Sequence, residues 1–455
     1  MRIVIVGVGR MGFSLAQELD SEGHEVSVVD PRADRAELAH TRLDVMAVAG
    51  SGCSRDMLRR AGAEDADLLL AVSGSDEVNI VSCLLARELG AKKRIARIES
   101  QSVKDVYDLR GVLGVDEFVT PRQITVARLL RILTVPGTTE SAEFAGGRVI
   151  LRAIRVEETS PLTAAPLSTV RELMPDVFLV TVVRRGEEFV VPTGAFRVEV
   201  GDVIYVVMRA PVFDRFLSTF KLRRPTSRRV FVLGASEVGL EFCARLAERR
   251  HDILLLEEDR AACERAAERL PRAVVIHGSS LDRDLLLDLN IGESTFFGLS
   301  DSVEANFAGA VVAKRLGADR AIMLASEPEQ VALFDRPPID AVVNPITVSV
   351  GAMLRSVRAG RVILLFRLAR NEFEALEIEA EAGSPGAGQP LRDVKFPRDA
   401  MVAAVIGKDG PRVATGDTVV VKGDHVIALA RSRAVNEVVR LFSVSGAAPT
   451  QGAQT

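Results

Sequence analysis

The chain repeats itself once, and this constrains its fold more than any other feature of the sequence. Gly7 recurs 227 positions later as Gly234, and the same offset relates further pairs of residues. These pairs are Gly12 with Gly239, Asp30 with Glu257, Ser73 with Ser300, Glu77 with Glu304, Asn79 with Asn306 and Gly90 with Gly317. Several matches at one offset predict two copies of one domain in a single chain.

Each copy alternates short apolar runs with segments of helical periodicity. In the first copy, runs such as IVIVG and EVSVVD precede expected helices near 11–22, 32–40, 54–61 and 77–90. Fully apolar strands separated by helices are typical of a parallel sheet that is covered on both faces. The sequence therefore predicts an α/β protein with two doubly wound, Rossmann-like domains.

A second kind of segment follows each copy, at 149–209 and again at 362–431. The two are aligned by VPTG at 191–194 and VATG at 413–416. Short strands, glycine and proline turns and helical ends favour a small α+β module. We therefore expect domain boundaries at 1–137 and 223–359 for the wound domains with their following helices, at 138–222 and 360–442 for the modules, and a disordered tail at 443–455.

Composition excludes several classes of protein. The 455 residues are 47% hydrophobic and 26% charged, which indicates a folded chain of several domains. A net charge of −4 gives no overall attraction to nucleic acid or anionic lipid. The sequence offers no apolar run of membrane-spanning length and no signal peptide, so we expect a cytoplasmic protein without direct lipid insertion. The four cysteines form no CxxC pair and are expected to be structural.

The first glycine turn, GVGRMG at 7–12, follows the strand RIVIV and opens a helix. In that context Gly7 allows a tight turn, Gly9 lets a diphosphate approach the backbone, and Gly12 permits close packing of helix on strand. Phosphates would lie on the helix N-terminus. Asp30 ends the next strand, where a carboxylate binds ribose hydroxyls and repels a 2′-phosphate, which favours NAD(H) or an adenosine nucleotide over NADP(H).

Ser73, Gly74 and Arg97 are expected at the same carboxyl edge of the first sheet. An arginine on an otherwise apolar strand needs an anionic partner. The sequence leaves two partners for Arg97: a nucleotide phosphate, or a carboxylate of the chain at Glu99 or Asp76.

The second turn, GASEVG at 234–239, is altered. Ser236 replaces the middle glycine, Leu324 stands where Arg97 would recur and Val303 where Asp76 would, although Glu257 keeps the acid. We expect this copy to have a structural role or a changed ligand.

A helix is expected after each wound domain, at 122–133 and 346–357. Ile124, Leu129, Leu130 and Leu133 form an apolar stripe on the first. The stripe leaves two alternatives open: packing on the helix's own domain, or crossing to a partner subunit. The basic linker at 221–229 is expected to be solvated, because no nucleic-acid-binding motif accompanies it.

The order of segments, together with GVGRMG, Asp30, AVSGSDEVN at 71–79, RIARI at 94–98, AGAEDAD at 61–67 and GDHVI at 423–427, resembles the TrkA family of regulatory subunits of Trk potassium uptake. The resemblance covers Met1 to about Phe442. It implies that each half is an RCK (KTN) nucleotide-binding domain followed by an RCK C-terminal module.

The resemblance further implies a peripheral protein on the cytoplasmic face of the inner membrane. Such proteins form a homo-oligomeric gating ring, here expected to be a tetramer, beneath an integral-membrane potassium-translocating Trk subunit. Binding of NAD(H), ATP or ADP would control transport. The resemblance assigns two sets of residues to nucleotide sites. The first set is Gly7, Val8, Gly9, Arg10, Met11, Gly12, Asp30, Ser73, Gly74 and Arg97, and the second is Gly234, Ala235, Ser236, Glu237, Val238 and Glu257.

Two other functions stay open on the sequence alone. An NAD-dependent oxidoreductase would share the glycine turn and the acid, but the sequence presents no recognisable catalytic residues and no metal cluster. An NAD-responsive repressor would need a helix-turn-helix motif and a basic face. A non-enzymatic regulator is the favoured hypothesis, and the sequence does not name its activating nucleotide.

Overall fold

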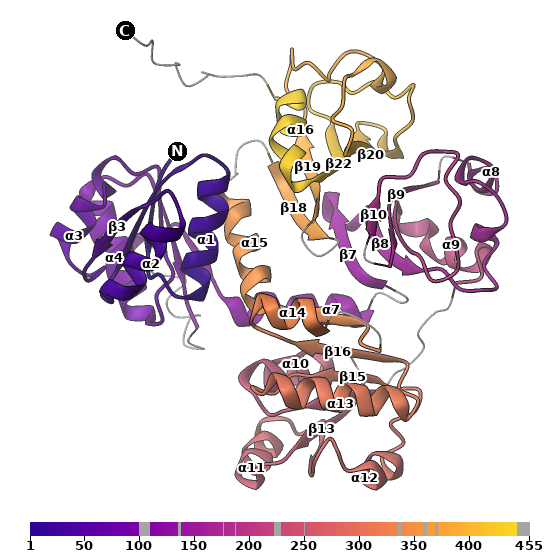
Figure 1. Cartoon of the computed structure of the whole chain (residues 1–455), viewed down its shortest axis with the longest axis horizontal. Coiled ribbons are helices and arrows are strands. Elements are labelled where there is room, and N and C mark those ends of the chain that lie inside the picture. Colours follow the sequence, from indigo (N-terminus) through magenta and orange to yellow (C-terminus); the bar gives the residue numbers. More distant parts are fainter. Residues whose placement is uncertain are drawn as a thin grey trace. The chain divides into compact units, whose positions relative to one another are not determined.

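A computed structural model describes residues 1–99, 110–134, 138–175, 177–186, 188–222, 229–249, 251–334, 338–357, 362–368 and 372–443. Most of the basic linker and nearly all of the tail expected beyond 443 lie outside these residues. The chain divides into two compact units, one formed by 1–130 with 227–357 and the other by 131–226 with 358–455. The first unit holds both wound domains and the second holds both modules (Figure 1).

The first wound domain contains a parallel sheet of order β3-β2-β1-β4-β5-β6. Its strands are β1 (Arg2–Val6), β2 (Glu25–Asp30), β3 (Met46–Ala49), β4 (Leu68–Ala71), β5 (Lys93–Arg97) and β6 (Glu117–Val119). Its helices are α1 (Arg10–Ser21), α2 (Ala33–Arg42), α3 (Arg55–Arg60), α4 (Asp76–Leu89) and α6 (Arg110–Leu113), followed by α7 (Pro121–Thr134).

The second wound domain repeats this topology, with the order β14-β13-β12-β15-β16-β17. The strands are β12 (Arg229–Leu233), β13 (Asp252–Glu257), β14 (Val274–His277), β15 (Thr295–Gly298), β16 (Arg320–Leu324) and β17 (Ala341–Val343). The helices are α10 (Glu237–Ala247), α11 (Arg260–Arg269), α12 (Arg283–Asp288), α13 (Val303–Arg315) and α14 (Pro328–Phe334), followed by α15 (Pro345–Val357). Two doubly wound, Rossmann-like domains are therefore confirmed.

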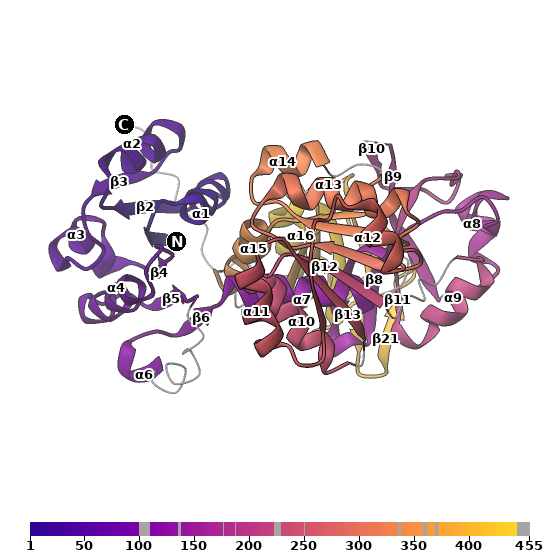
Figure 2. The same ribbon diagram turned by 90° about the horizontal axis from the view of Figure 1, so that it is seen from below.

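Helices cover both faces of the first sheet, as fully apolar strands require. Alternate strand residues point to opposite faces, so Ile3 and Ile5 pack against α1 while Val4 and Val6 pack against α3 and α4. Figure 2 shows α1 and α4 on opposite sides of this sheet. The carboxyl ends of its parallel strands consequently meet at one edge, beside the N-terminus of α1.

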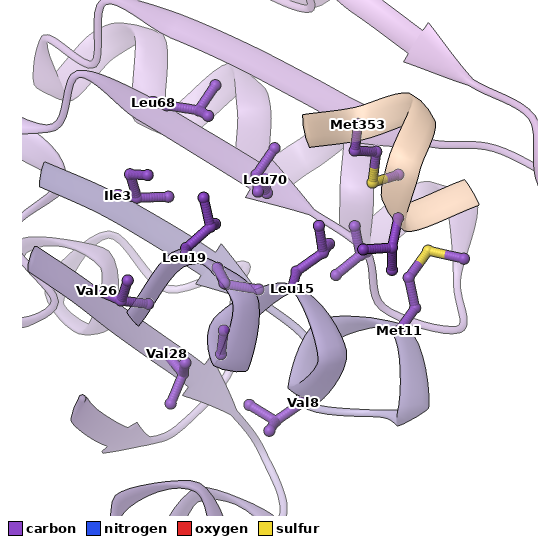
Figure 3. Close-up of a cluster of buried hydrophobic side chains, with 14 of the residues drawn as sticks. Ile3, Val8, Met11, Leu15, Leu19, Val26, Val28, Leu68, Leu70 and Met353 are labelled. Atoms are coloured by element: carbon purple, nitrogen blue, oxygen red, sulfur yellow. The ribbon is translucent and has the colours of Figure 1, made fainter. Parts of the chain in front are cut away.

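Helix α15 belongs to the second half of the chain but completes the core of the first domain. Val350, Met353 and Leu354 are buried in one cluster with Leu15 of α1 and Leu70 of β4. Figure 3 shows Met353 on the same side of the sheet as Leu15 and Met11. A helix after a wound domain does cross away from its own domain, but it crosses to the other half of the same chain.

Helix α7 contacts both its own wound domain and helix α10 of the second one. Ile124 packs against the core of its own domain. Arg122, near its start, forms ion pairs with Glu237 and Glu241 of α10, at 3.1 and 3.0 Å. The apolar stripe therefore contacts the helix's own domain through Ile124, and a crossing to a partner subunit stays a prediction.

The two modules are antiparallel sheets. The first has the order β10-β9-β11-β8-β7, with β7 (Thr138–Phe144), β8 (Val149–Arg155), β9 (Phe178–Arg185), β10 (Glu188–Val190) and β11 (Val203–Arg209), and helices α8 (Leu167–Arg171) and α9 (Phe213–Thr219). The second has the order β18-β19-β22-β20-β21, with β18 (Val362–Leu368), β19 (Phe373–Glu379), β20 (Ala400–Gly407), β21 (Gly410–Val413), β22 (His425–Arg431) and α16 (Val435–Phe442). Small α+β modules are confirmed.

The two modules share a hydrophobic core. Leu151 and Tyr205 of the first module and Phe373 and Leu429 of the second lie in one buried cluster. Glu377 of β19, which is buried, accepts a hydrogen bond from the backbone N–H of Ala145 at 3.0 Å. The duplication thus yields paired modules as well as paired wound domains.

Three of the four cysteines are buried. Burial raises the pKa of the Cys83 and Cys243 thiols to about 12, so both stay protonated and unreactive near neutral pH. Cys263 is also buried, and Cys53 is exposed. Across the described part of the chain, no helix is long and apolar enough to cross a membrane.

Truncation of Met353 tests the packing of α15 on the first wound domain. Met353→Ala should destabilise the first wound domain by about 2–4 kcal/mol, because it opens a cavity in a fully buried cluster. Hydrogen exchange at the amides of β1 and α1 should accelerate, whereas Leu287→Ala, at an exposed position of α12, should leave it unchanged. Unchanged exchange in Met353→Ala would contradict the packing of α15 on this domain.

Candidate functional site

The three glycines of the first turn meet different steric demands. Gly7 has φ +96°, and a Cβ there would lie 2.6 Å from the Cα of Ser73. A Cβ on Gly12 would lie 1.8 Å from the carbonyl oxygen of Gly7. Gly9 is different, because the nearest atom to its Cβ position is 4.0 Å away, on Arg35. The space beside Gly9 is therefore open to a ligand, whereas Gly7 and Gly12 are required by the fold.

Among the described residues, no side chain caps the N-terminus of α1. Gly9 is its N-cap residue, no side-chain hydrogen bond caps it, and its first turn contains no acidic residue. The first backbone N–H groups of a helix lack partners within the helix and carry a partial positive charge. Such an end binds phosphate or another anion.

Asp30 ends β2 beside this turn and is buried. Its carboxylate accepts hydrogen bonds from the backbone N–H of Val8 at 2.7 Å and of Arg32 at 2.9 Å. The acid therefore fastens the glycine turn to the end of β2. A carboxylate has about four acceptor sites, so two backbone bonds leave capacity for ribose hydroxyls.

The opposite wall comes from the ends of β4 and β5. Asn79 of α4 accepts a hydrogen bond from the N–H of Ser73 at 2.8 Å and donates one to the carbonyl of Arg97 at 2.9 Å. Arg97 in turn donates to the carboxylate of Glu99 at 2.7 Å and to the carbonyl of Ser73 at 3.2 Å. The chain itself thus supplies an anionic partner for Arg97, the second of the two alternatives for this residue.

These walls enclose a cleft of about 510 Å³. It brings together eight residues that the sequence assigned to the first site, namely Gly7, Gly9, Arg10, Met11, Asp30, Ser73, Gly74 and Arg97. The other two do not line it: Val8 is buried in the core and Gly12 packs on the turn. Sequence reasoning missed the remaining lining residues, which are Val6, Pro31, Arg32, Arg35, Ser51, Gly52, Val72, Ser75, Val78 and Ile346.

Among the missed residues, Arg32 and Arg35 follow Asp30 closely, and this basic sequence could have indicated a phosphate-binding wall. Ile346 could not have been found in this way. It lies 316 positions after Asp30 and reaches the cleft only because α15 packs against the first domain.

The second turn has the same backbone and different chemistry. Gly234 has φ +99°, and the carboxylate of Glu257 accepts a hydrogen bond from the N–H of Ala235 at 2.7 Å. Ser236, however, caps α10 itself: its Oγ accepts from the N–H of Gly239 at 3.1 Å and donates to the carbonyl of Leu299. The hydroxyl of Ser236 therefore accepts a hydrogen bond from an amide of α10 whose counterpart in α1 has no side-chain cap.

Glu237 adds a negative charge at the N-terminus of α10. Its carboxylate pairs with Arg269 at 2.9 Å and Arg122 at 3.1 Å. The Arg269 hydrogen bond, the largest influence, lowers the pKa of Glu237, which keeps it ionised. Val238 follows on α10, half-buried, and Leu324 replaces the guanidinium of Arg97. A phosphate here would face a carboxylate.

The fold and the first cleft define a nucleotide-binding class. A doubly wound sheet with an open helix N-terminus at a glycine turn and an acid after the second strand is typical of domains that bind dinucleotides or adenosine nucleotides. Comparison with known proteins narrows this class.

The model of the TrkA-N domain matches residues 3–121 and 230–345, and that of the TrkA-C domain matches 375–443. The Trk system potassium uptake protein TrkA of Halomonas elongata is 32% identical over 454 residues, covering 98% of this chain and 99% of the relative. That of Azorhizobium caulinodans is 32% identical over 455 residues, with the same coverage. The chain belongs to the TrkA family.

Solved structures agree with this assignment at the level of fold. The crystal structure of the GsuK RCK domain has a TM-score of 0.59 at 15% identity and covers 97% of this chain and 94% of its own. The GsuK channel bound to NAD also has a TM-score of 0.59 at 15% identity, covering 97% and 78%. Both confirm the arrangement of wound domains followed by α+β modules in each half.

Two glycine substitutions should separate binding from folding. Gly9→Ala should leave stability nearly unchanged but weaken binding of ADP or NADH about 10-fold or more, because its Cβ enters the space beside the helix N-terminus. Gly12→Ala should instead destabilise the domain by about 3 kcal/mol through its clash with Gly7. Thermal unfolding and calorimetric titration would measure both, and tight binding by Gly9→Ala would contradict phosphate placement at this turn.

Proposed function

We propose that this chain is the nucleotide-binding regulatory subunit of a Trk-type potassium uptake system. Its curated relatives are named as Trk system potassium uptake proteins, and the resemblance spans nearly the whole chain. The proposed ligand of the first cleft is NAD(H) or an adenine nucleotide such as ATP or ADP. NAD in the GsuK channel supports a nucleotide in this fold.

The observation that carries the proposal is the contrast between the two helix N-termini. At α1 no side chain caps the helix, and Gly9, Asp30 and Arg97 surround the open end. At α10 the cap is Ser236, and Glu237 occupies the first helical position. One copy is therefore built to receive an anion, and the other satisfies the same backbone groups internally.

We assign different roles to the two sets of site residues. The first set, from Gly7 to Arg97, would hold the nucleotide, with the diphosphate on the N-terminus of α1 and the ribose on Asp30. In the second set, Gly234, Ala235, Ser236, Glu237, Val238 and Glu257 would keep the geometry of the turn and join α10 to α7 through Arg122. The second copy is accordingly a structural partner of the first.

The proposed partner is the integral-membrane potassium-translocating Trk subunit, bound at the cytoplasmic face of the inner membrane by a homotetrameric ring of this chain. A nucleotide changes the state of such a ring only if it binds one arrangement more tightly than another. Regulation then requires no chemical step. We therefore propose a protein that is not an enzyme, and membership of the TrkA family favours it over the NAD-dependent oxidoreductase.

Substitution of the two acids tests the assignment of the nucleotide to the first cleft. Asp30→Ala should weaken binding about 10- to 100-fold, because a buried carboxylate that accepts ribose hydroxyls is lost. Glu257→Ala is the matched control, since it removes the same bond to the turn in the second copy and should leave affinity unchanged. Equal losses in calorimetric titrations of both variants would reject the assignment.

A reconstituted system tests the regulatory role. We expect potassium flux through vesicles containing the Trk membrane subunit to depend on this chain and to change on addition of ATP, ADP or NADH. The change should be absent with Asp30→Ala. Steady turnover of NADH with carbonyl substrates, or flux that ignores the nucleotide, would overturn the proposal.

A further inference from the structure

Arg10 lines the nucleotide cleft and also forms an ion pair with the second wound domain. It is the first residue of α1 and lines the nucleotide cleft. Its guanidinium forms an ion pair at 2.5 Å with Glu327, which belongs to the second wound domain. Arg10 therefore pairs with another part of the first unit and also lines the cleft in which we place the nucleotide.

The position of Glu327 is fixed by the second domain. It lies between β16 and α14, and its backbone N–H donates to the side chain of Gln330. The carbonyl of the preceding residue, Ser326, accepts a hydrogen bond from Asn344 at 3.1 Å. Glu327 does not line the cleft. Its carboxylate is thus a part of the second domain that reaches Arg10 without belonging to the binding site.

The ion pair is exposed, and this makes it displaceable. The side chains of Arg10 and Glu327 are 63% and 42% exposed. Exposed pairs contribute little to stability, and their loss changes an equilibrium by no more than about five-fold. A terminal phosphate carries more charge than a carboxylate and accepts a two-pronged interaction from arginine. It would therefore compete effectively with Glu327.

We propose that Arg10 exchanges Glu327 for the terminal phosphate of a bound nucleotide, so that the phosphates of the ligand control how the second wound domain is held. The inference rests on the proposed nucleotide site in the first cleft. A nucleotide ending in a terminal phosphate, such as ATP or ADP, offers Arg10 this partner. NAD has its diphosphate esterified at both ends and leaves the pair with Glu327 intact.

Arg122 makes another contact between the wound domains, and its side chain is far less exposed than that of Arg10. Arg122 is only 12% exposed and pairs with both Glu237 and Glu241, while donating to the backbone carbonyl of Glu99 at 2.9 Å. None of these partners lines the cleft. The link through Arg122 would persist when a nucleotide binds, so exchange at Arg10 changes one contact and leaves the domains joined.

Glu327→Gln tests the exchange with the full chain. Removing the competing carboxylate should tighten ATP and ADP binding about two- to five-fold and change NAD affinity little. Glu264→Gln is the matched control: it removes the same charge from an exposed pair within α11 of the same domain and should have no effect. Calorimetric titration at low salt measures all three nucleotides.

The Arg10→Gln background shows whether the effect passes through Arg10. There, Glu327→Gln should give no further gain, because the two substitutions remove one interaction. A gain that persists without Arg10, or no gain in the single variant, would overturn the exchange while leaving the nucleotide site intact. Failure of the wild-type chain to bind any nucleotide would instead reject the proposed site, and the exchange with it.

Hydrogen exchange gives a second readout that does not depend on affinity. Saturating ATP should accelerate exchange at the amides of α14 in the wild-type chain, because Glu327 loses its partner. Saturating NAD should not. Acceleration by both nucleotides, or by neither, would contradict the proposal.

Discussion

The first amides of a helix must find acceptors, and the way in which they do so separates the two halves of this chain. At α10, Ser236 supplies the acceptor from within the turn. At α1 the corresponding residue is Gly9, and no side chain caps the helix. One hydroxyl group thus caps the second helix from within the turn, whereas the first helix is left open for the anion that we propose there. The backbone, the acid after the second strand and the following asparagine remain the same.

Much of this contrast could be predicted from the sequence, because it depends on local geometry. Gly12 is required by a contact within the turn and Gly7 by the close approach of Ser73, and the repeat at a constant offset predicted two wound domains, each followed by a module. The sequence left the partner of Arg97 open. Its strand position indicated an anionic partner, but only the structure shows Glu99 in that role. The proposed domain boundaries remain predictions, since the compact units pair the two halves and do not follow chain order.

The contacts that join the halves could not be predicted. An amphipathic stripe shows that a helix buries one face, but it contains no information on the surface that it covers. Met353 and Ile346 reach the first domain from more than 220 positions beyond its last strand, and the partner of Arg10 lies 317 positions further along the chain. Likewise, the short strands and turns of each segment predicted a small α+β module, whereas the core shared by the two modules required the structure.

Coupling between a binding site and a distant domain requires contacts of unequal strength. If every contact between the wound domains were buried, a nucleotide could not alter one without disrupting the packing of both. The contacts differ here in that respect. The α15 core and the side chain of Arg122 are largely shielded from water, whereas Arg10 and Glu327 are both exposed to it. A solvated pair can be exchanged at little cost. Under the proposed exchange, the molecule combines a stable connection between its halves with one contact, that of Arg10 with Glu327, that a bound nucleotide would change.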